Sequence, residues 1–540
     1  MCTLSWQIDK NQLTIIFNRD DDAAASPDAS PEKPPVTEAV VNTSILGPKD
    51  PESGGYRIAA NEHGLVFCLM EDDNTGATSG LKKSKQDIDG IIRSISTAKD
   101  PFELRGMLGA LKPRQYKPFQ LIVFPGMSTP LQWQWDGRSF REIIAPRPLI
   151  TTSSFLPSLT GKLRLRTFRN ATGNFQHPLP EDRHLALHRS RRPWPPAISI
   201  ATKRKNSATV SLTRVRVTPE SIHMAWQPGD PVTSRQPSHE HSLQRRANAL
   251  LQRNMVMPDR FEGDTVRIDT LFREKSPSLY RRFPGWVMGL IRFILKEKRL
   301  NNYLNKARNL PCCLVATNVL NHLDVRAKVK PGSGPMPEHH KRLVFIANHP
   351  TGGLDGLLLL SWLSTYYPDI RIIVNELLWH VPHIRPLIVP VDIYSKGTNS
   401  VKTVMKAFEK DSPLLIFPSG HAARRIKGRL TEAPWQNMAV KMALKHNRNM
   451  VPLHIDGQSS RLFHNVAWLR RKAKMKLNLE LLFLSRAMIH PACRMYGITV
   501  GSLLTPGQIQ DLGENDHERT AKLQQICENL PASINQGTHP

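Results

Sequence analysis

The chain has 540 residues and a formal net charge of +28 at pH 7. That length exceeds one ordinary domain, and we expect two. The basic excess predicts an anionic partner, either nucleic acid or a membrane surface. Because the sequence shows no basic motif with the interleaved aromatic residues typical of RNA or DNA readers, we expect an anionic membrane surface and no nucleic acid.

The charge is unevenly spread along the chain. Residues 1–100 hold 16 acidic and 10 basic side chains, so the remaining residues carry a formal charge of +34. The N-terminus lacks the basic start and long apolar stretch of a signal peptide, and no stretch gives eighteen apolar residues in a row. We therefore expect a cytoplasmic protein that is peripheral to the inner face of the membrane and binds it through its second half.

Strand patterns dominate the first 228 residues. An apolar run at 13–17, a hairpin signal at 61–64 and period-two alternation at 208–226 each predict strands. The acidic segment rich in Pro, Ala and Ser that ends near Pro35 predicts a loop or local disorder. This half is typical of a layered α+β domain.

Several motifs of this half resemble the NRDE, or TANGO2-like, family over roughly residues 1–228: MCTLSW, FNRDD, GGYRIAANEHGLVFCLM, NFQHPLPEDRH and ATVSLT. The family signature ends in Glu, where this chain has Asp21. The resemblance implies a fold like that of N-terminal-nucleophile hydrolases, in which removal of Met1 would leave Cys2 with its own α-amine as base. A Cys2-dependent amidase and a non-catalytic lipid- or haem-binding scaffold are therefore alternative functions. One cysteine at an N-terminus also needs no catalytic role.

The cysteines show no paired metal spacing, and we expect a reduced compartment, no bound metal and no cofactor. They are Cys2, Cys68, Cys312, Cys313, Cys493 and Cys527.

A change in composition follows residue 228. Residues 229–258 are polar, contain proline and lack any period, so we expect a linker. The later segment WVMGLIRFILKEKR is too short to span a bilayer. With Trp286 at one end and basic residues at the other, it suits a helix at a membrane interface, and a core helix explains the pattern equally well. The expected apolar contacts with lipid are Trp286, Leu290, Ile291 and Ile294.

The second domain, residues 259–540, centres on LVFIANHPTGGLDGLLLL at 343–360. Its apolar start predicts a covered parallel strand, and its end predicts a helix. The loop between them carries His349 at the carboxyl end of a strand, where ligands collect in open α/β sheets. A histidine acting as general base needs a partner on its other ring nitrogen, and Asp355 can fold back to supply one. Taken alone, this loop is equally well explained as structural.

Three more apolar runs end in turns: LIVPVD at 387–392, LLIFPSG at 414–420 and MVPLHIDG at 450–457. Arg424 and Arg425 follow the second turn and form a candidate phosphate site, since guanidinium groups suit phosphate geometry. A solvated charge pair is the alternative. We expect the His349 loop, this turn and the two arginines to converge.

Together with KGRLTEAPWQNMAVKMA and VPLHIDGQSSRLFH, these motifs resemble the glycerophospholipid acyltransferase superfamily from about Pro284 to Gln508, most closely its haemolysin-like or ornithine-lipid branch. The resemblance implies an α/β domain that moves a fatty acyl group from acyl-CoA or acyl carrier protein to a hydroxyl of a lysophospholipid-like acceptor. His349 would be the base and Asp355 would orient its ring. The family usually carries a Glu in or just after the FP-x-G turn, where this chain has Ser419 and His421, which leaves substrate binding by that block open.

The expected catalytic residues are therefore His349 and Asp355, with Cys2 for the alternative activity. The expected substrate-binding residues are Asn348, Gly352, Gly353, Pro418, Ser419, Gly420, Arg424 and Arg425.

Overall fold

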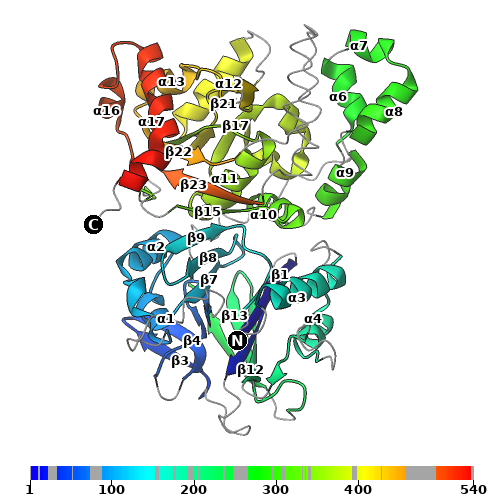
Figure 1. The fold of residues 1–540 in the computed structure, drawn as a ribbon, viewed down its shortest axis with the longest axis vertical. Helices are drawn as coiled ribbons and strands as arrows, with labels where there is room; N and C mark the ends of the chain where they lie inside the picture. The colour runs from blue at the N-terminus through cyan, green and yellow to red at the C-terminus, as the bar shows by residue number, and fades with distance from the viewer. Residues whose placement is uncertain are drawn as a thin grey trace. The chain divides into compact units, whose positions relative to one another are not determined.

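The structure is a computed structural model that divides into two compact units, Met1–Met255 and Val256–Pro540 (Figure 1). It describes residues 2–9, 12–21, 33–50, 53–72, 88–152, 157–173, 178–191, 199–204, 207–234, 238–246, 266–275, 277–294, 297–306, 310–330, 333–334, 336–337, 342–391, 398–426, 429–457 and 494–536. The acidic segment expected to be a loop lies mostly outside these ranges, and its end at residues 33–35 begins a strand.

Two antiparallel sheets make up the centre of the first unit. In the first sheet the strand order is β10-β1-β2-β12-β13-β14, with β11 paired to β12. Its strands are β1 (Cys2–Asp9), β2 (Gln12–Asp21), β10 (Leu149–Thr151), β11 (Lys203–Arg204), β12 (Ser207–Val217), β13 (Ser221–Pro228) and β14 (His239–Gln244). The second sheet runs β9-β8-β7-β6-β5-β4-β3, with β3 (Lys33–Val40), β4 (Thr43–Lys49), β5 (Ile58–Asn61), β6 (Leu65–Glu71), β7 (Phe119–Pro125), β8 (Leu131–Trp135) and β9 (Phe140–Ile144).

The alternation of side chains along β1 explains how this unit is layered. Leu4 and Trp6 lie in the apolar core that the two sheets share. Thr3 and Ser5 point to the other face, as the period of a strand requires, and contact helices α3 (Pro157–Ala171) and α4 (Glu181–His188). Helices α1 (Gly90–Ile95) and α2 (Pro101–Ala110) lie beside the second sheet (Figure 1), and the short helix η3 (Pro113–Gln115) follows α2. The predicted mixture of helices and large sheets is confirmed.

A chain of buried hydrogen bonds joins β1 to α4. The Ser5 hydroxyl lies 2.7 Å from Nε2 of His184 and 2.6 Å from Nε2 of His188. Nδ1 of His188 lies 2.8 Å from Oδ1 of Asn18, which can only accept. His188 therefore carries its proton on Nδ1, Ser5 donates to His188, and His184 donates to Ser5. Both rings are neutral in this arrangement, and Nδ1 of His184 has no hydrogen-bond partner among the described residues.

Part of the predicted linker is a strand. Within residues 229–258, His239–Gln244 form β14 and pair with β13. The pattern was missed because only Leu243 of this edge strand is buried. Residues 247–258 lie outside the described ranges.

One mixed sheet organises the second unit, in the order β18-β17-β19-β16-β22-β23-β15. Neighbours are parallel except β22 and β23. The strands are β15 (Arg326–Val329), β16 (Leu343–Ala347), β17 (Arg371–Asn375), β18 (Ile388–Val391), β19 (Leu414–Ile416), β22 (Asn449–Ile455) and β23 (Met495–Val500), and the hairpin of β20 (Arg424–Ile426) and β21 (Arg429–Thr431) is separate. The carboxyl ends of β16, β17, β19 and β22 therefore meet at one edge of the sheet.

Helices cover both faces of this sheet. Val344 and Ile346 of β16 pack in a core with residues of α12 (Thr398–Glu409), α13 (Met438–Lys445), α16 (Pro506–Gln510) and α17 (Asp516–Gln536). On the other face Phe345 contacts Tyr367 at the end of α11 (Gly353–Tyr366), and α11 packs on α10 (Cys312–Leu323). The short helices η5 (Glu376–His380) and η6 (Pro382–Leu387) connect β17 to β18.

Among the described residues, four helices of this unit precede α10 in the chain: α6 (Ile268–Lys275), α7 (Pro277–Arg282), α8 (Gly285–Ile294) and α9 (Glu297–Lys306). Met288 and Ile291 of α8 are buried against Ile268, so the expectation that Ile291 faces lipid is wrong. The side chain of Ile294 lies outside the described part of the structure. Among the described residues, no helix is both long and apolar enough to cross a membrane.

Candidate functional site

The loop between β16 and α11 is fixed at its start by Asn348. The amide of this side chain accepts a hydrogen bond from the backbone N–H of Ile455 at 2.7 Å and donates one to its carbonyl at 3.0 Å. This bidentate pairing joins the loop to the end of β22. Asn348 thus has a clear anchoring role, and its expected contact with substrate stays a prediction.

Asp355 lies in the first turn of α11 and is fully buried. Its Oδ2 accepts hydrogen bonds from the backbone N–H groups of Thr351, at 2.8 Å, and Gly352, at 2.9 Å, and its Oδ1 accepts one from the Thr351 hydroxyl, at 2.5 Å. Gly352 has φ +83°, a conformation that a side chain would strain. Gly353 is already the first residue of the helix. The loop therefore folds back onto the carboxylate, as the glycines predicted.

His349 meets Asp355 inside this loop. Its Nδ1 lies 3.1 Å from Oδ2 of Asp355, and 18% of its side chain is exposed. The ring stacks on Phe417, the residue before Pro418, with centroids 4.3 Å apart. A carboxylate on one nitrogen and a partly open ring is the arrangement that a general base requires.

The turn after β19 lies against this loop. Gly420 has φ +65°, and the backbone N–H of Ala423, just beyond the turn, donates to the His349 carbonyl at 2.8 Å. The single proton of the Ser419 hydroxyl faces two acceptors, the carbonyl of His421 at 3.0 Å and the side chain of Glu432. The turn and the His349 loop therefore come together, as the sequence suggested.

The two arginines begin the hairpin that follows. Arg424 starts β20 and is partly buried, and Arg425 pairs with Leu430 across the hairpin. The side chain of Arg425 lies outside the described part of the structure. Phosphate binding by this pair remains a prediction.

A carboxylate that the sequence analysis missed lies at the same place. Glu432 follows β21, and its Oε1 accepts a hydrogen bond from the backbone N–H of His349 at 3.0 Å. It also hydrogen-bonds with Ser419, and burial raises the pKa of its carboxyl. The signal that could have found it is that Glu432 is the first acidic residue after the FPSG turn.

Cys2 occupies a different environment in the first unit. Its side chain belongs to the core between the two sheets, and burial raises the pKa of its thiol. Its backbone N–H donates to the Thr152 hydroxyl at 3.0 Å. Asp20 is buried nearby and accepts a hydrogen bond from Thr209 at 2.6 Å, while Arg19 pairs with Asp21 at 3.1 Å. Burial in this core therefore favours the neutral thiol over the thiolate.

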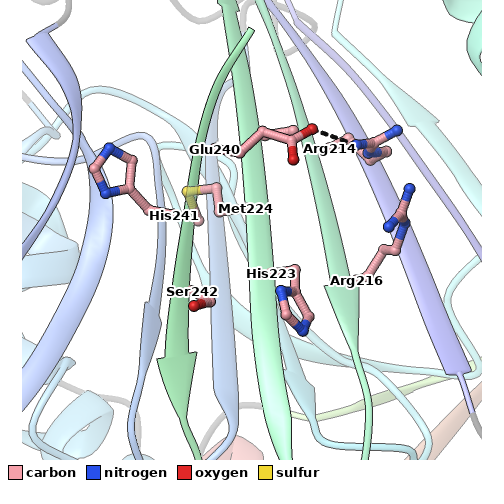
Figure 2. Close-up of a pocket in the computed structure, with 8 residues that line it drawn as sticks. Arg214, Arg216, His223, Met224, Glu240, His241 and Ser242 are labelled. Carbon is pink, nitrogen blue, oxygen red and sulfur yellow. Dashed lines mark hydrogen bonds and ion pairs between the residues drawn. The ribbon is translucent and has the colours of Figure 1, made fainter.

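Figure 2 shows a hollow on the face of β12, β13 and β14. It is lined by Arg214, Arg216, His223, Met224, Ala225, Glu240, His241 and Ser242. Arg214 and Arg216 both bind Glu181, at 2.5 and 2.6 Å, and Arg214 also binds Glu240 at 3.1 Å. The guanidinium charges are thus offset by carboxylates, and nothing in this hollow favours an anionic ligand.

The second unit is similar to known acyltransferases. An acyltransferase family model matches residues 270–525. Two relatives match over 238 residues: the lyso-glycine lipid O-acyltransferases of Phocaeicola vulgatus, 28% identical, and of Bacteroides thetaiotaomicron, 26% identical. Each match covers 44% of this chain, and 85% and 87% of the two relatives. These matches confirm the predicted acyltransferase, and they do not favour an amidase or a scaffold.

Solved structures similar to this chain include two variants of conjugated bile acid hydrolase from Clostridium perfringens. They have TM-scores of 0.32 and 0.29 with 9% identity, and cover 46% of this chain and 97% and 99% of theirs. The resemblance of the first half to the NRDE family stays a prediction.

Proposed function

We propose that the second unit moves a fatty acyl group from a thioester donor, acyl-CoA or acyl carrier protein, to the hydroxyl of a lysolipid. The observation that carries this proposal is the contact between His349 and the buried Asp355 at the carboxyl edge of the sheet. The family match and the two relatives support acyl transfer to a lysolipid-like acceptor. The donor class is inferred from the chemistry, since a thioester is an activated acyl group that a hydroxyl can attack.

In the proposed acyl transfer, the acceptor hydroxyl attacks the thioester directly. His349 takes the proton of the acceptor hydroxyl while that oxygen attacks the thioester carbonyl, and Asp355 stabilises the imidazolium that forms. The C–O bond forms, the C–S bond breaks, and the proton on His349 passes to the departing thiolate. The enzyme holds hydroxyl and thioester close together, which supplies much of the rate enhancement.

The acceptor class is proposed from the relatives. Both are named for a lyso-glycine lipid, and we extend this to lysolipids in which one hydroxyl is free and one fatty chain is present. Purified protein should release free thiol from acyl-CoA or acyl carrier protein only when such an acceptor is added, and the lipid product should gain one acyl chain by mass spectrometry. The variant His349→Ala should lose this activity while keeping its circular dichroism spectrum. Wild-type turnover in His349→Ala would refute the proposed mechanism.

We also propose that the second unit binds an anionic membrane surface through α8. Trp286, Leu290 and Phe293 recur at the spacing of one helix face and are 70%, 49% and 67% exposed. The opposite face carries Met288 and Ile291 and is buried. The sequence could not set this phase, because large apolar residues lie on both faces of the segment.

The helices before and after α8 carry exposed basic residues. Arg281 and Arg282 end α7, and Lys298 lies in α9. Each such residue near an anionic surface contributes about 1 kcal/mol, an attraction that salt screens. The aromatic and aliphatic face adds a contribution that salt does not weaken.

Sedimentation with anionic vesicles tests this proposal. The wild type should bind at low salt and be released only in part at high salt. The double variant Trp286→Glu, Phe293→Glu should lose the salt-resistant fraction, whereas Val401→Glu, at an exposed apolar position of α12, should not. Failure of the wild type to sediment at low salt would exclude this membrane surface as a partner.

A further inference from the structure

The backbone of His349 is held on both sides by groups that are distant in the sequence. Its carbonyl accepts a hydrogen bond from the N–H of Ala423, and its N–H donates to Glu432 at 3.0 Å. The second contact spans 83 residues and ends on a carboxylate rather than a backbone carbonyl. A charged acceptor forms a stronger and more directional bond than a neutral one.

Glu432 also binds the neighbouring turn. Its carboxylate hydrogen-bonds with Ser419 and interacts electrostatically with His349, although burial opposes its ionisation. The same side chain therefore joins the loop that carries the imidazole to the turn whose Phe417 stacks on that imidazole. Loss of this carboxylate would therefore remove one hydrogen bond from the loop and one from the turn.

We infer that Glu432 is a positioning residue for the acyl transfer, which as an ionised carboxylate fixes His349 between Asp355 and Phe417. Glu432 lies 13 residues after Ser419, outside the FPSG turn itself. Its negative charge also favours the protonated imidazole that forms during the reaction. This inference rests on the proposed function, and it concerns kcat rather than substrate affinity.

Two substitutions at Glu432 separate its role as a hydrogen-bond acceptor from the effect of its charge. Glu432→Ala removes the acceptor, and kcat should fall about 10- to 100-fold, because small misplacements of a catalytic group have effects of this size. Glu432→Gln keeps a neutral acceptor for the His349 N–H, so kcat should recover to within about fivefold of the wild type. The Michaelis constants for donor and acceptor should change less than threefold in both. Glu514→Ala, an exposed residue before α17, is the matched control.

The pH profile supplies a readout that a purely structural role would not change. Removal of a negative charge disfavours the imidazolium, so the free base persists to lower pH and the acidic limb of kcat should move to lower pH in Glu432→Gln. Full kcat in Glu432→Ala, or an unmoved limb in Glu432→Gln, would overturn the inference. If Glu432→Ala does not fold, the position of the acidic limb of the kcat profile in Glu432→Gln tests the inference by itself. Activity in His349→Ala would instead refute the proposed function itself, so the two failures are distinguishable.

Discussion

Asp355→Asn isolates the charge of the buried carboxylate from its structural role. An asparagine can place its carbonyl oxygen where Oδ2 now accepts from Thr351 and Gly352, and its NH2 can donate to the Thr351 hydroxyl. The loop should therefore keep its hydrogen bonds. What disappears is the attraction between the carboxylate and the imidazolium of His349.

The size of this loss follows from the distance of 3.1 Å between Nδ1 and Oδ2. Two unit charges at that separation attract by about 5 kcal/mol at an effective dielectric constant of ~20. Because the proton is only partly transferred in the transition state, about half of this should be lost, which corresponds to roughly 100-fold in kcat.

Thiol release from acyl-CoA under saturating acceptor would measure the effect of Asp355→Asn on kcat. Thermal unfolding should show little change for this variant and a clear loss for Asp355→Ala, in which the N–H groups of Thr351 and Gly352 are left unpaired. A kcat within threefold of the wild type in a folded Asp355→Asn protein would refute the charge argument.

Two further predictions concern stability. Arg448 is fully buried and donates to the carbonyls of four residues, among them Phe408 and Ser412, so Arg448→Met should lower the free energy of unfolding of the second unit by about 3 kcal/mol in urea. Burial lowers the pKa of His184 to about 4 and that of His188 well below its usual value, so both rings are neutral in the folded state and protonate on unfolding. The free energy of unfolding should therefore be highest above about pH 6.5 and should fall as the pH falls toward 4, by about 3 kcal/mol for His184. A first unit whose melting temperature does not fall between pH 7 and 5 would contradict this.

The parts of the second unit that could be predicted are those encoded locally. Strand β16 follows from five consecutive apolar residues, and the contact between His349 and Asp355 follows from glycines within a short loop. Glu432 could not be found in this way, because its partner His349 lies far away in the sequence and the fold alone brings them together.

The errors have a similar cause. Ile291 was expected to face lipid because large apolar residues lie on both faces of α8, and the sequence of α8 does not show which face is buried. The burial of Ile291 depends on Ile268 of α6. Strand β14 is polar along its length and gains its structure by pairing with β13. In both cases the deciding information lies in a neighbouring element.

The anchoring of the loop has a consequence for catalysis. Asn348 is held by the end of β22, and the backbone of His349 is held by Ala423 before β20 and by Glu432 after β21. Asp355 binds the loop itself, while the ring of His349 keeps a partly exposed surface for substrate. A base held this firmly loses little conformational freedom when the acceptor binds, so little of the lipid chain's binding energy is spent on ordering the base and most of it appears as affinity. Shortening the acyl chain of the acceptor should therefore weaken binding more than it slows the chemical step.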